Sequence, residues 1–172
     1  MHVLEALGHA PTLLNANSTR FAKLVDLNYS RNGELLSANI GTSMLEKSRV
    51  TLESANDRNY LLFYYMLSGL DKTTLDTLQL AGIQKHRITK VPEGLSSYQS
   101  RQWNEKFFEW RQAMLNLSFS EEDLKTLYRL VAVIILLCDL EFQLVKDNTG
   151  NNKGNGVQHT KKVNSYTKNM TK

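Results

Sequence analysis

The pattern that most restricts the fold is a pair of short alternating segments joined by an Asn-Gly dipeptide. Residues 21–29 alternate in side-chain polarity, and residues 34–40 follow after the tetrapeptide S-R-N-G at residues 30–33. Alternation with a period of two is typical of a β-strand, and Asn-Gly between two such segments is a strong short-range signal for a hairpin. We therefore predict an antiparallel β-hairpin over residues 21–40.

The remainder of the chain as far as residue 145 has helical patterns. Phe107, Trp110 and Met114 lie at helical spacing and predict an amphipathic helix. The apolar run from Leu130 to Cys138 is hydrophobic nearly all round, which predicts a helix in the centre of the fold rather than at its surface. The predicted helices cover residues 2–7, 57–69, 73–80, 103–117 and 121–140. The expected fold class is therefore α/β but mostly helical, with the hairpin followed by a helical subdomain at residues 44–145.

The last segment, residues 146–172, differs sharply in composition from what precedes it. It contains six Lys and one Asp, a net charge of +5. Because the whole chain carries +4, residues 1–145 together carry about −1. Its Asn, Lys, Thr and Gly residues bury too little apolar surface to offset ordering entropy, which predicts disorder. Either a surface insertion or translated non-coding sequence would explain so abrupt a change. Since the high pI belongs to this tail, we expect no nucleic-acid partner.

Several classes of protein are disfavoured by simple counts. The start of the chain lacks the basic and apolar regions of a signal peptide, and the longest apolar run is nine residues, against about 20 for a membrane span. We therefore expect a cytoplasmic chain without a membrane span. Cys138 is the single cysteine, which excludes a disulfide framework and predicts a small buried side chain. Lys85, His86 and Arg87 read as a solvated loop, and His86 has no ligand partner at metal-binding spacing.

Residues 15–23 (N-A-N-S-T-R-F-A-K) concentrate the polar chemistry of the chain just before the first strand. Ser18 and Thr19 offer hydroxyl oxygens of the kind that Mg²⁺ accepts. Asn amides donate to phosphate oxygens, and the guanidinium of Arg20 suits a carboxylate or a phosphate. Asn, Ser and Thr are equally ordinary in turns and caps. From their chemistry alone, these residues fit a phosphate site or a simple loop.

The same stretch resembles the switch I loop of the myosin motor domain, whose pattern is N-x-N-S-S-R-F-G-K. Thr19 replaces a Ser, and Ala22 replaces a Gly. Three further phrases resemble the family in the same order. The first, V-L-E-A-L-G-H-A-P-T before the loop, resembles V-L-E-A-F-G-N-A-K-T, with Pro11 in place of Lys; the others are M-L-E-K-S-R-V and D-R-N-Y-L-L-F-Y-Y-M-L-S-G. A fourth further likeness, F-S-E-E with the apolar run up to Phe142, completes the set; Ser118, Cys138 and Asp139 depart from it.

The resemblance implies a role for each matching residue. Asn15 and Asn17 would contact the nucleotide, and Ser18 would lie at the γ-phosphate and the attacking water as the catalytic group. Thr19 would ligate Mg²⁺. Arg20 would form a salt bridge with the Glu of switch II. The implied cofactors are ATP and Mg²⁺, the implied partner is the actin filament, and the implied location is cytoskeletal. The fold would be part of a P-loop NTPase motor head, with residues 21–40 as a transducer hairpin.

Two parts of the family's nucleotide site are not found in the sequence. No segment fits the P-loop pattern G-x-x-x-x-G-K-[ST], and D-N-T-G at residues 147–150 has only the spacing of switch II. Although the family is an actin-activated ATPase, we expect this chain to require the remainder of a motor head and not to hydrolyse ATP alone. Arg20 is expected to lack a partner. An alternative from another class is a nucleotide-independent interaction module that keeps the helical scaffold of a motor head.

Overall fold

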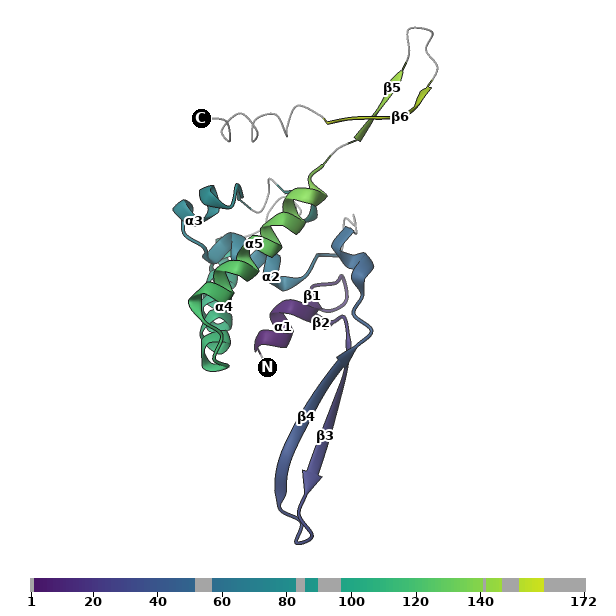
Figure 1. Ribbon diagram of the computed structural model, residues 1–172. Helices are drawn as coiled ribbons and strands as arrows, with labels where there is room; N and C mark the ends of the chain where they lie inside the picture. Colours follow the sequence, from purple (N-terminus) through teal and green to yellow (C-terminus); the bar gives the residue numbers. More distant parts are fainter. Residues whose placement is uncertain are drawn as a thin grey trace.

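The computed structural model is a helical body from which a long two-stranded hairpin projects (Figure 1). The structure describes residues 2–51, 57–82, 86–89, 97–140, 142–146 and 152–159. In chain order the elements are α1 (His2–Gly8), β1 (His9–Ala10), β2 (Ser18–Thr19), β3 (Ala22–Tyr29), β4 (Leu35–Ser43), η1 (Lys47–Thr51), α2 (Leu61–Gly69), α3 (Lys72–Thr77), η3 (Arg87–Thr89), α4 (Ser97–Asn116), α5 (Glu121–Cys138), β5 (Phe142–Lys146) and β6 (Asn152–His159).

The predicted hairpin is confirmed as β3 and β4, which pair antiparallel with Val25 opposite Ile40 and Leu27 opposite Ala38. Gly33 closes the turn with a φ of +83°, a conformation that an L side chain adopts only with strain. Its N–H donates to the Ser30 carbonyl at 3.0 Å. Pairing continues to Ser43, beyond the predicted end at residue 40. The structure adds two further antiparallel ladders, β1 with β2 and β5 with β6.

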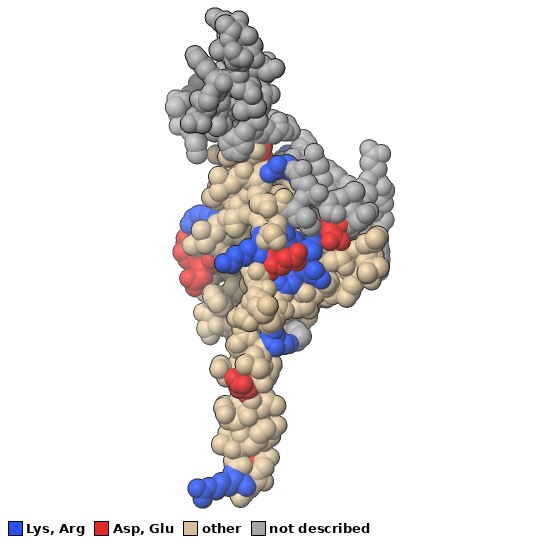
Figure 2. Space-filling view, turned by 90° about the vertical axis from the view of Figure 1, so that its right-hand side faces the viewer, with Lys and Arg blue, Asp and Glu red and all other residues tan. Residues whose placement is uncertain are grey.

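All residues of β3 and β4 are exposed. Because side chains alternate between the two faces of a strand, Val25, Leu27, Tyr29 and Ile40 lie on one face. Their exposed fractions are 44, 48, 57 and 56%. Figure 2 shows this arm as a mostly uncharged surface. The hairpin is therefore amphipathic, and its apolar face has no cover among the described residues.

The core lies in the helical body, where α2 packs between α4 and the other helices. Every residue of α2 from Leu61 to Leu67 is buried. The aromatic rings are close-packed, with 4.8 Å between the ring centroids of Tyr64 and Trp103. A Cβ on Gly69 would lie 2.2 Å from the ring of Phe107, so only glycine permits this approach of α2 to α4. The aromatic residues of α2 are thus core residues, as their helical spacing predicts.

Helix α5 starts with a capping box formed by Ser120 and Asp123. The Asp123 N–H donates to Ser120 Oγ at 3.2 Å, and the Ser120 N–H donates to Asp123 Oδ2 at 2.8 Å. Hydrogen bonds from Ser120 hold the pKa of the Asp123 carboxyl below its usual value. The cap fixes where the helix begins, and the predicted element is confirmed with its end at Cys138 rather than residue 140.

The prediction that α5 lies centrally is wrong. Its buried side is formed by Leu124, Tyr128, Val131, Ala132, Ile135 and Cys138. The opposite side carries Leu130, Val133, Ile134 and Leu137, which are 60, 52, 38 and 59% exposed. Only one side of the helix meets the other described helices, so the all-round apolar pattern leaves an uncovered stripe. None of the helices in the described ranges is both long and apolar enough to cross a membrane.

His86 also differs from the sequence-based expectation, because it is buried with 1% of its surface exposed rather than solvated. Its Nδ1 lies 2.6 Å from Asp139 Oδ2, and its Nε2 accepts the Ala81 N–H at 2.9 Å. The Arg87 N–H also donates to Asp139, at 2.7 Å. These bonds attach the η3 segment to the end of α5. Lys85 lies outside the described residues.

Strand β6 lies inside the segment 146–172 for which the sequence predicts disorder. It pairs with β5, with Leu144 opposite Val157. The composition argument counts apolar side chains, whereas a ladder is made of backbone hydrogen bonds that almost any residue can form. The other residues of this segment beyond Lys146 lie outside the described part of the chain, so the expectation of disorder is untested for them.

Candidate functional site

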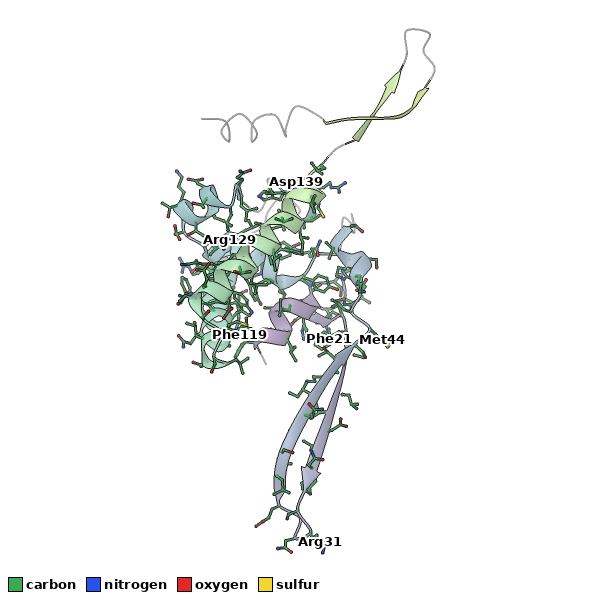
Figure 3. The ribbon with its side chains drawn as sticks, viewed as in Figure 1. Phe21, Arg31, Met44, Phe119, Arg129 and Asp139 are labelled. Atoms are coloured by element: carbon green, nitrogen blue, oxygen red, sulfur yellow. The ribbon has the colours of Figure 1, made fainter. Side chains whose placement is uncertain are left out.

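Residues 15–23, the stretch that resembles switch I, lie where the hairpin joins the helical body. Strands β1 and β2 form a two-residue ladder, with His9 opposite Thr19 and Ala10 opposite Ser18. Residues 11–17 are the loop between these strands. Phe21, labelled in Figure 3, lies at the root of the hairpin beside α1. Asn15, Asn17 and Thr19 are exposed, whereas Ser18 and Arg20 are partly buried.

The loop folds through its own short polar side chains. The Asn15 N–H donates to Thr12 Oγ1 at 3.1 Å, and the Thr12 N–H donates to the Asn15 carbonyl at 2.8 Å. Asn15 Oδ1 accepts the Asn17 N–H at 2.9 Å, which is an Asx turn. The turn interpretation of these residues is therefore correct for the local backbone. It uses the Asn15 carboxamide oxygen and leaves the exposed amide nitrogen as the group that would face a phosphate.

The loop is also attached to residues 57–58. The Arg58 N–H donates to the Pro11 carbonyl at 3.0 Å, and the Leu13 N–H donates to Asp57 Oδ1 at 3.3 Å. The loop of residues 11–17 and the phrase D-R-N-Y, which are about forty residues apart in the sequence, therefore meet directly. Nothing in the local sequence of the loop indicates this contact.

Four side chains form a continuous chain of hydrogen bonds across the base of the loop. Asn17 Nδ2 donates to Glu5 Oε1 at 3.0 Å, and Asn17 Oδ1 lies 2.9 Å from His9 Nδ1. His9 Nε2 lies 3.2 Å from Thr19 Oγ1. The structure therefore unites two predicted site residues, Asn17 and Thr19, through two residues that the sequence does not single out. Only the register of β1 against β2 places His9 beside Thr19.

Arg20 has a partner in this chain, so the expectation that it lacks one is wrong. Its NH1 lies 3.4 Å from Glu46 Oε2, and its NH2 donates to Ser18 Oγ. Its backbone joins α1 to the segment after β4, because the Arg20 N–H donates to the Gly8 carbonyl at 2.8 Å and the Arg20 carbonyl accepts the Glu46 N–H at 2.9 Å. The family resemblance gives no indication of this pair, because it implies a partner for Arg20 in switch II. Within the described residues, Arg20 Nε is buried without a hydrogen bond.

Glu46 is shared between two arginines. Arg49, only 3% exposed, donates from Nε and NH2 to the two Glu46 oxygens at 2.8 and 3.2 Å. Arg20 makes the longer contact. Hydrogen bonding from Arg49, with a smaller contribution from Arg20, holds the pKa of the Glu46 carboxyl below its ordinary value. The Tyr60 hydroxyl donates to the Glu46 carbonyl at 2.7 Å, which fixes the backbone here. Glu46 therefore holds Arg20 less firmly than it holds Arg49.

Two small residues, Gly8 and Ala22, lie where α1 meets the start of the β3–β4 hairpin. A Cβ on Gly8 would lie 2.4 Å from the ring of Phe21, so glycine is needed for Phe21 to pack on α1. Ala22 stands where the family phrase has Gly. It begins β3 and is not among the described residues with positive φ, so its methyl group causes no backbone strain. The Gly-to-Ala departure is thus compatible with this conformation.

Two of the predicted site residues keep exposed polar groups of the kind that a nucleotide site uses. Thr19 offers an exposed hydroxyl oxygen, a suitable single ligand for Mg²⁺, and Asn15 is an exposed amide that suits a phosphate. The Ser18 oxygen is occupied by Arg20, and the Asn17 amide is occupied by Glu5 and His9. A neighbouring cavity of about 300 Å³ includes Asn17 and Lys106, but the carboxylates of Glu5, Glu105 and Glu109 outnumber that one cation. Those carboxylates would repel phosphates, and the described residues contain no cluster of three or more acidic, His or Cys side chains that could hold a metal.

Comparison with known proteins identifies the family. The family described as "Myosin head (motor domain)" matches residues 2–171, a range that includes the compositionally distinct end of the chain. "Myosin-1" of Saccharomyces cerevisiae is 31% identical over 147 residues, covering 81% of this chain. "Myosin type-2 heavy chain 2" of Schizosaccharomyces pombe is 33% identical over 86% of the chain, and "Unconventional myosin heavy chain 6" of Caenorhabditis elegans is 32% identical over 87%.

In each of these relatives the match covers 7% of the relative's own length. The phrases of the sequence that resemble the family all lie within the matched residues. Because the family matches nearly the whole chain and relatives above 30% identity cover most of it, the chain belongs to the myosin head family and corresponds to part of a motor domain.

Proposed function

We propose that this chain acts as part of an actin-based, ATP-driven motor head and that residues 15–20 contribute contacts to ATP and Mg²⁺ there. The observation that carries the proposal is the family match combined with the local geometry, in which Asn15 in the loop and Thr19 in β2 are both exposed. The complete head would be a P-loop NTPase associated with the cytoskeleton in the cytoplasm. Its actin-contacting surface is not assigned to residues of this chain.

In this proposal Asn15 and Asn17 donate hydrogen bonds to phosphate oxygens, and Ser18 orients the γ-phosphate and the attacking water. Thr19 supplies a hydroxyl ligand to Mg²⁺, which when bound would neutralise charge on the phosphates. Arg20 forms the salt bridge with a switch II carboxylate. Ser18 and Arg20 contact each other here, so engagement of the nucleotide requires Arg20 to leave the Ser18 oxygen. The long Arg20–Glu46 contact, 3.4 Å, is compatible with such an exchange.

Two uncovered apolar surfaces support the idea that the chain works inside a larger structure. One is the hairpin face with Val25, Leu27 and Ile40, and the other is the α5 stripe with Leu130 and Leu137. A two-stranded hairpin is at best marginally stable in water unless further strands or a helix cover it. The remainder of a motor head would provide that cover for both surfaces.

The nucleotide prediction is tested by calorimetric titration of the 172-residue chain with ATP and Mg²⁺. Without a P-loop to hold the phosphates, we expect a dissociation constant no better than about 1 mM, equivalent to roughly −4 kcal/mol, and no phosphate release. Micromolar affinity would contradict the proposal that the site is incomplete. Sequencing of the complete transcript tests the motor assignment, since a motor requires an upstream frame encoding G-E-S-G-A-G-K-T and a downstream D-x-x-G-F-E. A mature message limited to Met1–Lys172 would exclude motor activity for this product.

One observation favours the alternative, a nucleotide-independent interaction module. The polar groups of Asn17, Ser18 and Arg20 find partners inside the chain without a nucleotide. A module of this kind would be a stable monomer that unfolds in one sharp transition and binds little hydrophobic dye. A chain separated from the rest of its head would instead bind dye at its two uncovered surfaces. Thermal unfolding and dye fluorescence on the same sample separate the two possibilities.

A further inference from the structure

His9 lies between two residues of the proposed nucleotide site. Its Nδ1 lies 2.9 Å from the Asn17 amide oxygen and its Nε2 lies 3.2 Å from the Thr19 hydroxyl. The ladder fixes His9 opposite Thr19. The ring also lies against Phe21, with 5.9 Å between ring centroids. Both nitrogens of one imidazole therefore contact residues to which the proposed function gives separate roles.

The neighbouring groups decide which nitrogen carries the proton. The Glu5 carboxylate can only accept, so Asn17 must turn its NH₂ group toward Glu5 and its oxygen toward His9. An amide oxygen only accepts, so His9 Nδ1 must be the protonated nitrogen. In the neutral ring, Nε2 then has a lone pair and accepts a hydrogen bond. The Thr19 hydroxyl is its donor.

This arrangement fixes the direction of the Thr19 hydroxyl. The hydroxyl hydrogen points to His9, so the two lone pairs of Oγ1 point away from the ring. Thr19 is exposed, and these lone pairs are therefore presented to solvent. A hard cation binds oxygen lone pairs and is repelled by a hydroxyl hydrogen. A rotated hydroxyl would present that hydrogen to the cation.

We propose that His9 is a positioning residue for the metal ligand Thr19, held in its Nδ1–H form by Asn17 and Glu5. The inference rests on the proposed function, because it concerns the Mg²⁺ ligand assigned there. It assigns a second duty to Asn17, which orients His9 as well as facing the nucleotide. The family phrase G-N-A-K-T has Asn at this position, so the sequence comparison gives no indication of the role.

The first test measures the tautomer without any nucleotide. A long-range ¹H–¹⁵N correlation spectrum of the 172-residue chain distinguishes a ring protonated on Nδ1 from one protonated on Nε2. The His9→Gln variant identifies the His9 signals by their loss. We expect the Nδ1–H form in the unmodified chain, and we expect that form to be lost in Asn17→Leu, which cannot accept from the ring. A ring protonated on Nε2 in the unmodified chain would overturn the proposal.

The second test measures the effect on the ligand itself. With ATP and Mn²⁺ in place of Mg²⁺ at millimolar concentration, paramagnetic broadening of the Thr19 methyl signal reports metal bound nearby, and Mg²⁺–ATP is the diamagnetic reference. Loss of a group that orients a metal ligand typically weakens metal binding about 10–100-fold, so His9→Phe should reduce the broadening by about tenfold. His9→Gln, whose amide oxygen can accept from Thr19, should restore part of it. His2→Phe removes an exposed histidine elsewhere and is the matched control.

The outcomes separate the two proposals. If the Thr19 methyl signal is not broadened in the unmodified chain even at ATP–Mn²⁺ concentrations well above about 1 mM, the nucleotide-site proposal fails, and the metal-positioning role of His9 fails with it. If broadening is present and is unchanged in His9→Phe, only the His9 inference fails. Methyl signals of the core residue Ile135 show whether each variant is folded. If His9→Phe does not fold, His9→Leu and His9→Gln provide the same comparison, in which equal broadening overturns the inference.

Discussion

The helical body and the β3–β4 hairpin use similar apolar residues in opposite ways. Ile135 in α5 is fully buried, whereas Ile40 in β4 is 56% exposed. Both lie on a regular apolar face, one with helical periodicity and the other with a period of two. The body covers its face with its own helices, while the hairpin extends away from them (Figure 1). An apolar pattern thus shows which side of an element is intended for burial, and not which molecule or segment covers it.

Helix α5 contains the same contrast within one element. Its side with Leu124 and Ile135 packs on the body, and its side with Leu130 and Leu137 faces solvent. An uncovered apolar face is therefore not peculiar to the β-structure of this chain, because a helix carries one as well. Both exposed faces are expected to behave differently from the core in solution, and this difference is measurable.

The largest effect is expected for isoleucine truncation on the two sides of the comparison. Ile135→Ala removes fully buried methyl groups and should lower the free energy of unfolding by about 2–5 kcal/mol. Ile40→Ala removes the same atoms from an exposed strand and should cost less than about 1 kcal/mol. Urea unfolding monitored by circular dichroism measures both. Equal costs would show that the hairpin face is covered in solution, which would break the distinction between the regions.

A smaller effect is expected at the junction of the two regions. Arg49→Met removes a buried cation and leaves Glu46 with its weaker partner Arg20, so we expect a loss of about 1–3 kcal/mol. Because the pKa of Glu46 is held below its ordinary 4.5 in the folded state, the stabilisation is present above that pH and disappears as the pH falls through the folded value. The difference in urea midpoint between wild type and variant should therefore shrink on acidification below that pH.

The control for this junction is Arg129→Met. Arg129 pairs with Glu122 at 3.4 Å, and both side chains are more than 60% exposed. An exposed pair contributes about 0–1 kcal/mol. If the Arg129 variant lost as much stability as the Arg49 variant, burial of Arg49 would not be the reason for its effect.

The hairpin turn provides a local test of independence. Gly33 has positive φ, so Gly33→Ala should strain the turn by about 1 kcal/mol. If the hairpin opens separately from the body, amide exchange of Leu27 and Ala38 should accelerate about fivefold while exchange in α2 does not change. Gly41→Ala is the matched control, because Gly41 lies in open space without a positive φ. Acceleration throughout the chain would indicate that hairpin and body unfold together.

The smallest change in stability is expected on the exposed stripe of α5. Leu137→Gln should alter the free energy of unfolding by no more than about 0.5 kcal/mol, since Leu137 is 59% exposed. Binding of a hydrophobic dye should nevertheless decrease, because an apolar part of the surface has been removed. Lys125→Gln, a polar change on the same helix, should leave dye binding unchanged. A large loss of stability in Leu137→Gln would mean that the stripe is covered in the isolated chain.

The candidate site was predictable to the extent that it consists of neighbouring residues. The stretch N-A-N-S-T-R-F-A-K and its four accompanying phrases are local patterns, and they led to the family that the comparisons confirm. Glu5, His9 and Glu46 were missed because their relevance depends on strand register and on the approach of η1. The burial of His86 was missed for the same reason, since its partner Asp139 lies 53 residues away.

The sequence by itself determined the hairpin, the helix positions and the family, because each depends on periodicity, turn chemistry or a short phrase. Tertiary structure alone decided which apolar faces are covered, which carboxylate Arg20 contacts and which side chain contacts the Thr19 hydroxyl. The physical reason is the range of the interactions: local patterns depend on neighbours within a few residues, whereas burial and side-chain pairing depend on segments that only folding brings together.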